Sequence, residues 1–277
     1  MKTVRTMCYI ALLVFLCSCG PAKEPTPAPE VTGGFEVSEL EVGKADATIL
    51  RTEQHCVVID CGERGDGKEV LQSLAEKGVS KVDYLFVTHF DKDHVGGAAK
   101  VLDNIEVEKI VTPAYEGTNN EYARYLKALE KHNISPTELT ENMSFVLDDV
   151  LFEVYPPMKS YYAEGDNDYS LAISVTHGSN RFLFAGDAEE ERLSEIMEQI
   201  DGAYDFLSVP HHGRFSKHSK LLFEKIRPKI SVITSSDKNL EEKETVAALE
   251  SIGSSVYLTR EGSVRVLSDG ENLTVNR

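Results

Sequence analysis

Four side chains of metal-ligand type lie within six residues: His89, Asp91, Asp93 and His94. The apolar run from Val82 to Val87 precedes them and predicts a buried strand, and a glycine pair follows them. Histidine and carboxylate groups gathered at a strand end are typical ligands of divalent metals. A solvated turn is the alternative, but it would hold several like charges together with Lys92 as the only local cation. The run therefore predicts a metal site.

Three other places share one pattern, in which an apolar strand runs into Asp or His next to Gly. They are Ile59-Asp60-Cys61-Gly62, Phe184-Ala185-Gly186-Asp187 and Val209-Pro210-His211-His212-Gly213. Strand ends are rigid supports for ligand groups, and glycine allows the backbone to approach a bound group closely. We expect all four strand ends to meet at one site.

The elements that must position these residues alternate along the chain. Apolar patterning predicts strands at 35–42, 47–50, 56–59, 82–87, 107–111, 171–176, 181–185, 205–209, 230–234, 256–259 and 263–267, and indicates that 145–154 is strand-rich. Helical periodicity predicts helices at 68–77, 95–102, 120–131, 189–200, 217–226 and 240–252. The strands form two batches, each interleaved with helices. This order predicts an α/β fold over residues 35–277, a four-layer αββα sandwich of two mixed sheets flanked by helices.

Composition limits the classes of function. The chain has 277 residues, 41% of them hydrophobic, and a formal net charge of −17. Such an excess of acid argues against a protein that holds nucleic acid on a broad basic surface. It does not exclude a nucleic-acid substrate at a metal centre, because the cations supply positive charge there.

Residues 1–19 read as a targeting segment. Lys2 and Arg5 give a basic start, Met7 to Leu16 is apolar but too short to span a membrane, and Leu16-Cys17-Ser18-Cys19 resembles a bacterial lipobox with Cys19 as the lipidated residue. An ordinary cleaved signal or a short anchor is the alternative. Residues 20–34 are proline-rich and predict an extended tether. We therefore expect a lipid-anchored protein of the bacterial cell envelope that contacts the membrane through its lipid anchor only.

Two cysteines remain beyond the targeting segment, Cys56 and Cys61, on either side of a predicted strand. The intervening strand separates them by roughly 16 Å, which is too far for a disulfide. We predict two free thiols; a zinc pair is the alternative.

The motifs together resemble the metallo-β-lactamase superfamily, and most closely the ComEC-like hydrolase domains of competence DNA-uptake proteins. The residues that carry the resemblance are the His89 to His94 run with Gly96-Gly97, Gly186-Asp187, and Pro210-His211-His212-Gly213. Weaker similarities lie at residues 42–47 and 257–262. The resemblance covers roughly residues 35–270 and implies the same four-layer sandwich.

The resemblance also implies a ligand set for two divalent metal ions, Zn²⁺ or Mn²⁺. His89 and Asp91 would bind one ion, Asp93 and His94 the other, and Asp187 would bridge both. The commoner form of the run has His at the position of Asp91, and the extra carboxylate makes Mn²⁺ as plausible as Zn²⁺. Asp60 matches an aspartate that orients the ligand loop from behind.

One ligand of the superfamily is missing here. Its third motif supplies a histidine upstream of the position of Asp187, but His177 lies at the turn of a predicted hairpin and Asp187 at its open end, roughly 20 Å away. The open end instead carries Asn167 and Ser170, which match an Asn-x-x-Ser of the ComEC-like group. We expect His211 and His212 to compensate, with one imidazole for each metal.

This ligand set implies a hydrolase in which metal-activated hydroxide attacks the substrate, with Asp93 orienting it as the catalytic residue. The favoured substrate is a phosphodiester such as DNA or an envelope polymer. Arg214 stands where the group usually has Ser and could hold a phosphate or carboxylate, or pair with a surface acid. Hydrolysis of a β-lactam or lactone, and a non-enzymatic metal-binding surface lipoprotein, are the alternatives.

Overall fold

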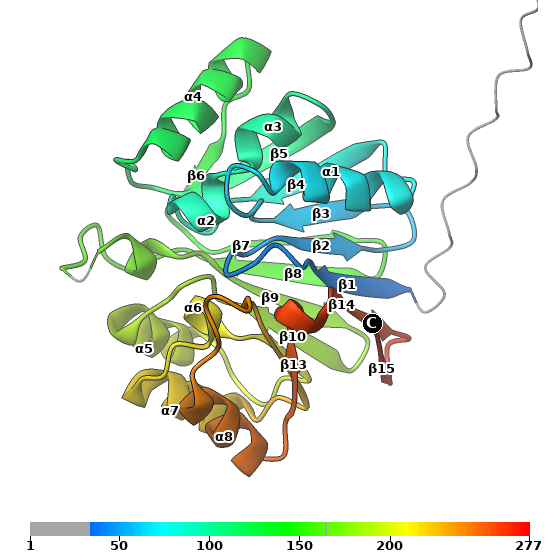
Figure 1. The fold of residues 1–277 in the computed structure, drawn as a ribbon, viewed down its shortest axis with the longest axis vertical. Helices are drawn as coiled ribbons and strands as arrows, with labels where there is room; N and C mark the ends of the chain where they lie inside the picture. Colours follow the sequence, from blue (N-terminus) through cyan, green and yellow to red (C-terminus); the bar gives the residue numbers. More distant parts are fainter. Residues whose placement is uncertain (1–33, 164) are drawn as a thin grey trace, which may run out of the picture.

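The computed structural model describes residues 34–163 and 165–277. The predicted targeting segment with Cys19, and the tether as far as residue 33, lie outside the described residues. Two sheets pack face to face, and helices cover the outer face of each (Figure 1). The predicted four-layer αββα sandwich is confirmed.

The first sheet has eight strands in the order β15-β14-β1-β2-β3-β4-β5-β6. Their bounds are β1 Phe35–Glu39, β2 Thr48–Arg51, β3 Cys56–Ile59, β4 Lys81–Phe86, β5 Glu106–Pro113, β6 Thr137–Leu139, β14 Val264–Ser268 and β15 Leu273–Asn276. Strands β3 to β6 are parallel, whereas β1 and β2 pair antiparallel with their neighbours. The chain thus returns at its end to complete the sheet with which it begins.

The second sheet has seven strands in the order β13-β12-β11-β10-β9-β8-β7. Their bounds are β7 Met143–Leu147, β8 Val150–Tyr155, β9 Ala172–His177, β10 Asn180–Phe184, β11 Phe206–Ser208, β12 Ile230–Ile233 and β13 Ser255–Leu258. Strands β10 to β13 are parallel, and β7, β8 and β9 add antiparallel hairpins. Both sheets are mixed, as the sequence predicts.

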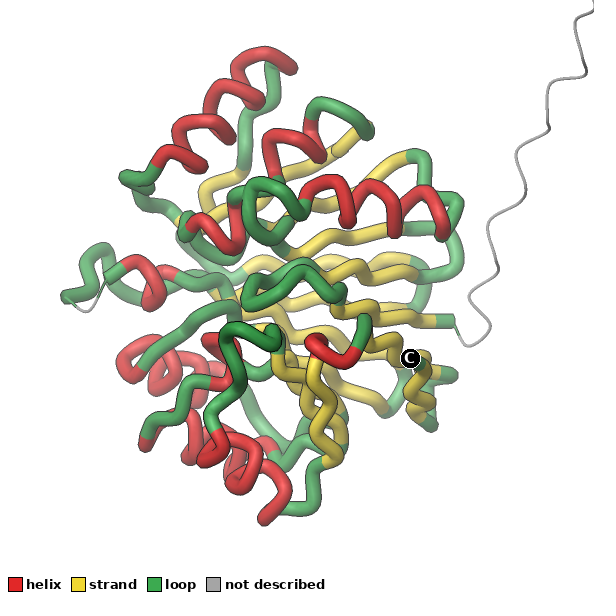
Figure 2. The backbone as a smooth tube through the Cα atoms, viewed as in Figure 1, coloured by secondary structure: helices red, strands yellow, loops and turns green. Residues whose placement is uncertain are grey.

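The helices divide between the two outer layers (Figure 2). The first sheet carries α1 Gly67–Glu76, α2 Lys92–Val95, α3 Ala98–Leu102 and α4 Asn120–His132, and the second carries α5 Glu190–Gln199, α6 Pro210–Gly213, α7 Lys217–Ile226 and α8 Lys243–Ser251. Two short 3-10 helices, η1 Asp166–Tyr169 and η2 Thr259–Glu261, lie in connections. Among the described residues, none of the helices has the length and apolar content needed to cross a membrane.

Three apolar cores hold the four layers together. Alternate residues at the end of β4 and just beyond it show this most simply, since Leu85 and Val87 pack under the helices while Tyr84 and Phe86 pack between the sheets. A third core lies between the second sheet and α5, α7 and α8. Both faces of the central strands are buried, which explains why they read as continuous apolar runs.

The structure departs from the predicted elements at several points. Of the helix predicted at 95–102, residues 98–102 form α3 and Val95 ends α2; the helix is divided at Gly96-Gly97 because the Gly97 amide donates to the carbonyl of Gly62 rather than within the helix. Strands β6 and β15 and both 3-10 helices were not predicted, because three or four residues give too little periodicity to detect. Cys56 and Cys61 are buried free thiols, as expected.

Candidate metal centre

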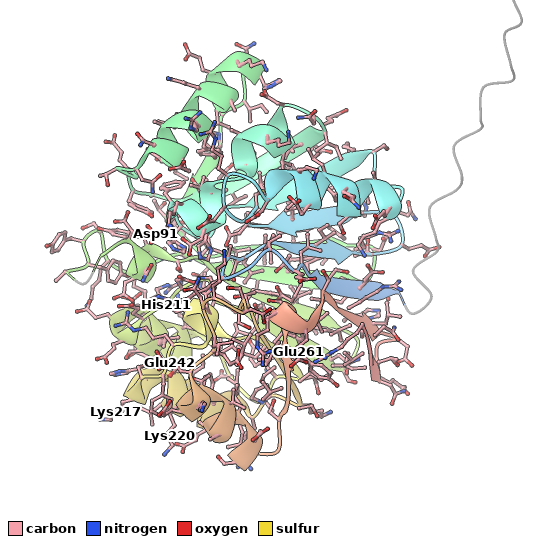
Figure 3. The ribbon with its side chains drawn as sticks, in the orientation of Figure 1. Asp91, His211, Lys217, Lys220, Glu242 and Glu261 are labelled. Atoms are coloured by element: carbon pink, nitrogen blue, oxygen red, sulfur yellow. The ribbon has the colours of Figure 1, made fainter. Side chains whose placement is uncertain are left out.

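The predicted ligand groups meet at one edge of the sandwich. Parallel strands β3, β4, β10 and β11 present their carboxyl ends to this edge, and β1 ends there too because it runs in the direction of β3. Figure 3 labels Asp91 and His211, which come from opposite halves of the molecule and lie at this edge. The four strand ends singled out in the sequence are therefore neighbours in space.

A compact cluster forms the centre of the site. Its members are Asp93, His94, Asp187 and His212, which each offer a ligand atom within 4.8 Å of the others. His94 Nε2 lies 3.2 Å from Asp187 Oδ1, and His212 Nε2 lies 3.3 Å from both Asp93 Oδ2 and Asp187 Oδ2. Two carboxylates and two imidazoles of this kind form a donor set that divalent metals prefer.

The state of these donor atoms fits a metal. Four buried atoms at the centre have no hydrogen-bond partner among the described residues: His89 Nε2, His94 Nε2, His212 Nε2 and Asp187 Oδ1. Buried polar atoms are almost always satisfied, and those left over in a native structure call for an ion or a water. The centre could thus hold divalent metal ions.

The remaining predicted ligands lie around Asp187 in a looser arrangement. His89 is fully buried, with its ring centroid 4.1 Å from that of His94, and His89 Nε2 lies 3.9 Å from Asp91 Oδ2. His211 Nε2 lies 3.8 Å from Asp187 Oδ2. These three side chains do not form a compact group of their own, unlike the four of the central cluster.

Asp60 supports the centre from behind. Its Oδ2 accepts the Thr88 hydroxyl at 2.6 Å and lies 2.8 Å from His94 Nδ1, while its Oδ1 accepts the Thr88 amide at 2.8 Å. Asp60 has a left-handed backbone, with φ of 57°, which turns the carboxylate toward both partners. A carboxylate at Nδ1 keeps the proton on that nitrogen and leaves Nε2 free to ligate.

Asp46 supports His212 in a similar way, although it was not among the predicted site residues. Its Oδ1 accepts the Thr234 hydroxyl at 2.7 Å and lies 3.3 Å from His212 Nδ1. Its amide donates to the Asp93 carbonyl, and its carbonyl accepts from the Gly62 amide. The weak similarity at residues 42–47 contained Asp46 and was the available signal; nothing in the sequence indicated Thr234.

The structure supports the argument that His177 is remote from the centre. His177 ends β9 and packs against Ser268, with 2.8 Å between Nδ1 and the hydroxyl oxygen. Ser170 lies at the open end of the β9–β10 hairpin, where its hydroxyl is 3.4 Å from His89 Nδ1 and accepts the Asp187 amide. Asn167 lies one turn earlier and donates to Glu189.

The backbone at the second histidine pair is unusual. His211, His212 and Gly213 are consecutive left-handed residues, with φ of 50°, 52° and 78°. Two such non-glycine residues in succession are rare and store strain, which occurs most often at functional sites. The two rings lie 6.1 Å apart, and both histidines reach Asp187.

Glycine is also required beside Asp187. Gly186 has φ of 51°, and a Cβ there would lie 2.8 Å from the Thr88 hydroxyl oxygen and 2.9 Å from that of Ser170. Both hydroxyls belong to the hydrogen bonds that position the ligand loops. The close approach of the backbone predicted from the Gly186-Asp187 pattern is therefore present.

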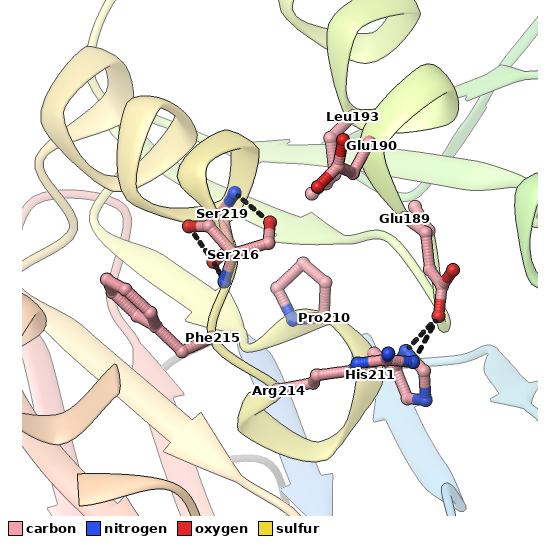
Figure 4. A pocket seen from close by; sticks show the side chains of 10 residues that line it. Glu189, Glu190, Leu193, Pro210, His211, Arg214, Phe215, Ser216 and Ser219 are labelled. Atoms are coloured by element: carbon pink, nitrogen blue, oxygen red, sulfur yellow. Dashed lines mark hydrogen bonds and ion pairs between the residues drawn. The ribbon is translucent and has the colours of Figure 1, made fainter. Parts of the chain in front are cut away.

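Arg214 does not reach the central cluster. Its Nη1 lies 2.8 Å from Glu189 Oε1, an atom that is also 3.0 Å from His211 Nδ1, and its side chain is 60% exposed. Figure 4 shows the Glu189 carboxylate joined by dashed lines to both side chains, at the edge of a pocket of about 220 Å³ that includes Pro210 and Phe215. Arg214 thus pairs with an acid in the structure, and its contact with a substrate stays a prediction.

The pKa values of the histidines differ between the central cluster and the looser ligands around Asp187. Burial opposes the charged forms of His94 and His212, but the carboxylate of Asp187, with Asp60 or Asp46, raises the pKa of each well above its usual value. Burial, together with the neighbouring His94, lowers the pKa of His89 to about 3. Burial and the neighbouring Asp93 raise the pKa of Asp91 to about 6. In the metal-free protein, the central histidines therefore carry protons and His89 does not.

Relatives of known sequence include competence and recombination proteins. Recombination protein 2 of Haemophilus influenzae is 26% identical over 206 residues, covering 73% of this chain and 24% of the relative. ComE operon protein 3 of Bacillus subtilis is 23% identical over 295 residues, covering 99% of this chain and 35% of the relative. The chain thus spans about a quarter to a third of the length of these curated relatives.

Solved structures of similar fold include YhfI from Bacillus subtilis, a metallo-beta-lactamase fold protein, with a TM-score of 0.51, 10% identity, and coverage of 81% of this chain and 96% of that one. A diphosphatase from the PhnP family matches with a TM-score of 0.50, 15% identity, and coverage of 83% and 97%. Residues 40–235 match the family described as the metallo-beta-lactamase superfamily. With this match over most of the chain and the predicted ligands gathered at one edge of an αββα sandwich, the chain belongs to the metallo-beta-lactamase superfamily.

Proposed function

We propose that this chain is a metal-dependent phosphodiesterase, with DNA or another phosphodiester polymer as its substrate. The superfamily consists generally of metallohydrolases. Asp91 carries the proposal, because it adds a third carboxylate to Asp93 and Asp187 where the commoner run has a histidine, and oxygen donors suit Mn²⁺ as well as Zn²⁺. The similarity to competence and recombination proteins supports a polynucleotide as the substrate.

The ligand side chains would divide between two metal ions. Asp93, His94, Asp187 and His212 would hold one ion, and His89, Asp91 and His211 a second one that shares Asp187. Bound divalent cations would supply Lewis acidity and lower the pKa of a coordinated water. Asp60 and Asp46 would keep the Nε2 atoms of His94 and His212 directed at the centre, and Ser170 would hold the Asp187 loop against His89.

Arg214 enters the proposal as a substrate contact beside the centre. Only Nη1 of its guanidinium engages Glu189, and the side chain is largely exposed. Its remaining nitrogens are therefore free to donate to a phosphate oxygen next to His211.

The test is hydrolysis of bis(p-nitrophenyl) phosphate by residues 31–277, with Mn²⁺ and with Zn²⁺. We expect metal-dependent turnover that Asp93→Ala abolishes and that Asp201→Ala, a change to an exposed carboxylate on the second sheet's side, leaves intact. Metal binding without turnover of any phosphodiester would refute the proposal.

The place of action is also a proposal. We propose that Cys19 is lipidated and holds the domain at the outer side of a bacterial membrane, in keeping with the lipobox-like Leu16-Cys17-Ser18-Cys19 and with the competence relatives. Incorporation of a labelled fatty acid by the full chain, lost in Cys19→Ser, is the expected result. Incorporation that persists in Cys19→Ser would refute lipidation at that residue.

A further inference from the structure

A basic groove lies between α3 and α4, outside the metal centre. Its volume is about 530 Å³, and five cationic side chains line it: Arg64, Lys100, Arg124, Lys127 and Lys131. Asp103 is the one carboxylate in its lining. The side chains of all five cations are exposed.

Four of these cations are without an internal partner. Within residues 34–163 and 165–277, no ion pair or hydrogen bond engages the side chain of Arg64, Lys100, Arg124 or Lys127, whereas Lys131 pairs with Asp103 at 2.7 Å. Some exposed cations elsewhere, such as Lys81, pair with carboxylates, whereas others, such as Lys225 on α7, make no ion pair within the described part of the chain but are not gathered in one groove. In a chain of net charge −17, unpaired cations gathered in one groove mark a local surface of opposite sign.

The groove adjoins the segment that carries two of the predicted ligands. Gly96 lines it and directly follows α2, the helix of Asp93 and His94. Helix α2 packs against α4, and in Figure 1 it lies between α4 and α6, the segment of His211 and His212. A chain-like ligand that leaves the centre across α2 would therefore meet the groove.

We propose that this groove docks the backbone of a DNA strand whose scissile phosphate lies at the metal centre. The inference rests on the proposed function and adds to it a binding surface for the part of the polymer that is not cleaved. The strand supplies a series of phosphates, and cations that track a backbone are how proteins hold single strands without reading their sequence. The negative net charge does not prevent this, since screening limits each charge to about 8–10 Å at ordinary salt.

The test compares two pairs of exposed cations on helices of similar length. Arg124→Gln with Lys127→Gln removes two charges from the groove, and Lys220→Gln with Lys225→Gln removes two from α7 on the other side of the molecule. Binding of a fluorescent 20-nucleotide DNA strand is followed against salt in the Asp93→Ala background, where the strand is not cleaved. Circular dichroism and thermal melting check that each variant is folded.

Counterion release sets the expected size of the effect. Each neutralised phosphate of a single strand contributes about 0.7 to the slope of log K against log salt, so the groove variant should lose roughly 1.4 from the slope and bind about tenfold more weakly at 0.15 M salt. The α7 variant should match the reference protein. An unchanged slope in the groove variant, or equal competition by polyglutamate, would refute docking of DNA in this groove.

Cleavage assays separate this inference from the proposed function. With Asp93 restored, the groove variant should hydrolyse bis(p-nitrophenyl) phosphate normally and lose about tenfold in kcat/KM on the 20-nucleotide strand. Normal turnover of both substrates by the groove variant would refute the groove and leave the phosphodiesterase in place. No turnover of either by any variant would refute the phosphodiesterase, and the salt slope alone would then decide the groove.

Discussion

The pair formed by Asp60 and His94 gives the sharpest test of how the fold prepares this centre. Asp60 has three donors around two oxygens: the Thr88 amide at Oδ1, and the Thr88 hydroxyl and His94 Nδ1 at Oδ2. Asp60→Asn keeps the shape and tolerates the left-handed backbone, since Asn adopts that conformation more readily than most residues. The substitution leaves one oxygen, so either the Thr88 amide or His94 Nδ1 must face an NH₂ group.

Both orientations of the new amide are costly. If the NH₂ faces the Thr88 amide, a buried donor is left unsatisfied at about 1–3 kcal/mol. If it faces His94, it donates to Nδ1 and moves the imidazole proton to Nε2, the nitrogen that would ligate. We therefore expect a loss of metal affinity of about 10–100-fold, or about 1.4–2.7 kcal/mol.

The assay is competition for Mn²⁺ or Zn²⁺ against a fluorescent chelator. Asp148→Asn is the matched control, because Asp148 also has a left-handed backbone and accepts the Thr52 hydroxyl and the Gln54 amide, remote from the centre. The control should lose stability without losing metal affinity. Metal affinity within twofold of the reference protein in a folded Asp60→Asn variant would refute the tautomer argument.

Three further predictions concern the same centre. Thr234→Val should lower metal affinity by about tenfold, because it removes the hydroxyl that lies between Asp46 and His212. The loss should be at the smaller end of such effects, since Asp46 still lies 3.3 Å from His212 Nδ1. An unchanged affinity, measured by calorimetry, would contradict this prediction. The raised pKa values of His94 and His212 leave both imidazoles protonated, so metal binding near pH 7 should release protons and should weaken as the pH falls. Calorimetric titrations in buffers of different ionisation enthalpy measure this release. Proton uptake on metal binding would contradict the prediction. Two ions should bind in separate phases, the compact cluster first, and Asp91→Asn should weaken only the second phase; loss of the first phase would reverse the assignment.

The central features of the fold could be predicted because their sequence signals are local. Strands such as β4 and β10 end in runs of three apolar residues, Tyr84-Leu85-Phe86 and Phe182-Leu183-Phe184, and helices such as α4 show an apolar stripe with Asn119 capping its start. Strand β6 has only three residues, and its place beside β5 is set by tertiary pairing. The division between α2 and α3 depends on the hydrogen bond from the Gly97 amide to the carbonyl of Gly62, which lies 35 residues away.

The donors of the candidate centre were likewise easier to predict than their supports. Histidine and aspartate next to glycine at a strand end are recognisable by type and spacing, and these residues do meet at one edge of the sandwich. Thr234 has no such signature, because a hydroxyl at the end of β12 becomes informative only when Asp46 and His212 are known to lie on either side of it.

The uneven support of the histidines has a consequence for the chemistry of the centre. His94 Nδ1 has the Asp60 carboxylate at 2.8 Å, and His212 Nδ1 has the Asp46 carboxylate at 3.3 Å with the Thr234 hydroxyl at 2.8 Å between them, whereas His89 Nδ1 has only the hydroxyls of Thr88 and Ser170 at 3.1 Å and 3.4 Å. A carboxylate raises the basicity of a ligating imidazole more than a hydroxyl does. The part of the centre around His89 should therefore be the weaker metal site and the more electrophilic one, and it is also the part bordered by the half-exposed Asp91, where a substrate can enter. We therefore expect an asymmetric centre, in which the compact cluster of Asp93, His94, Asp187 and His212 holds its ion more tightly and substrate approaches from the His89 side.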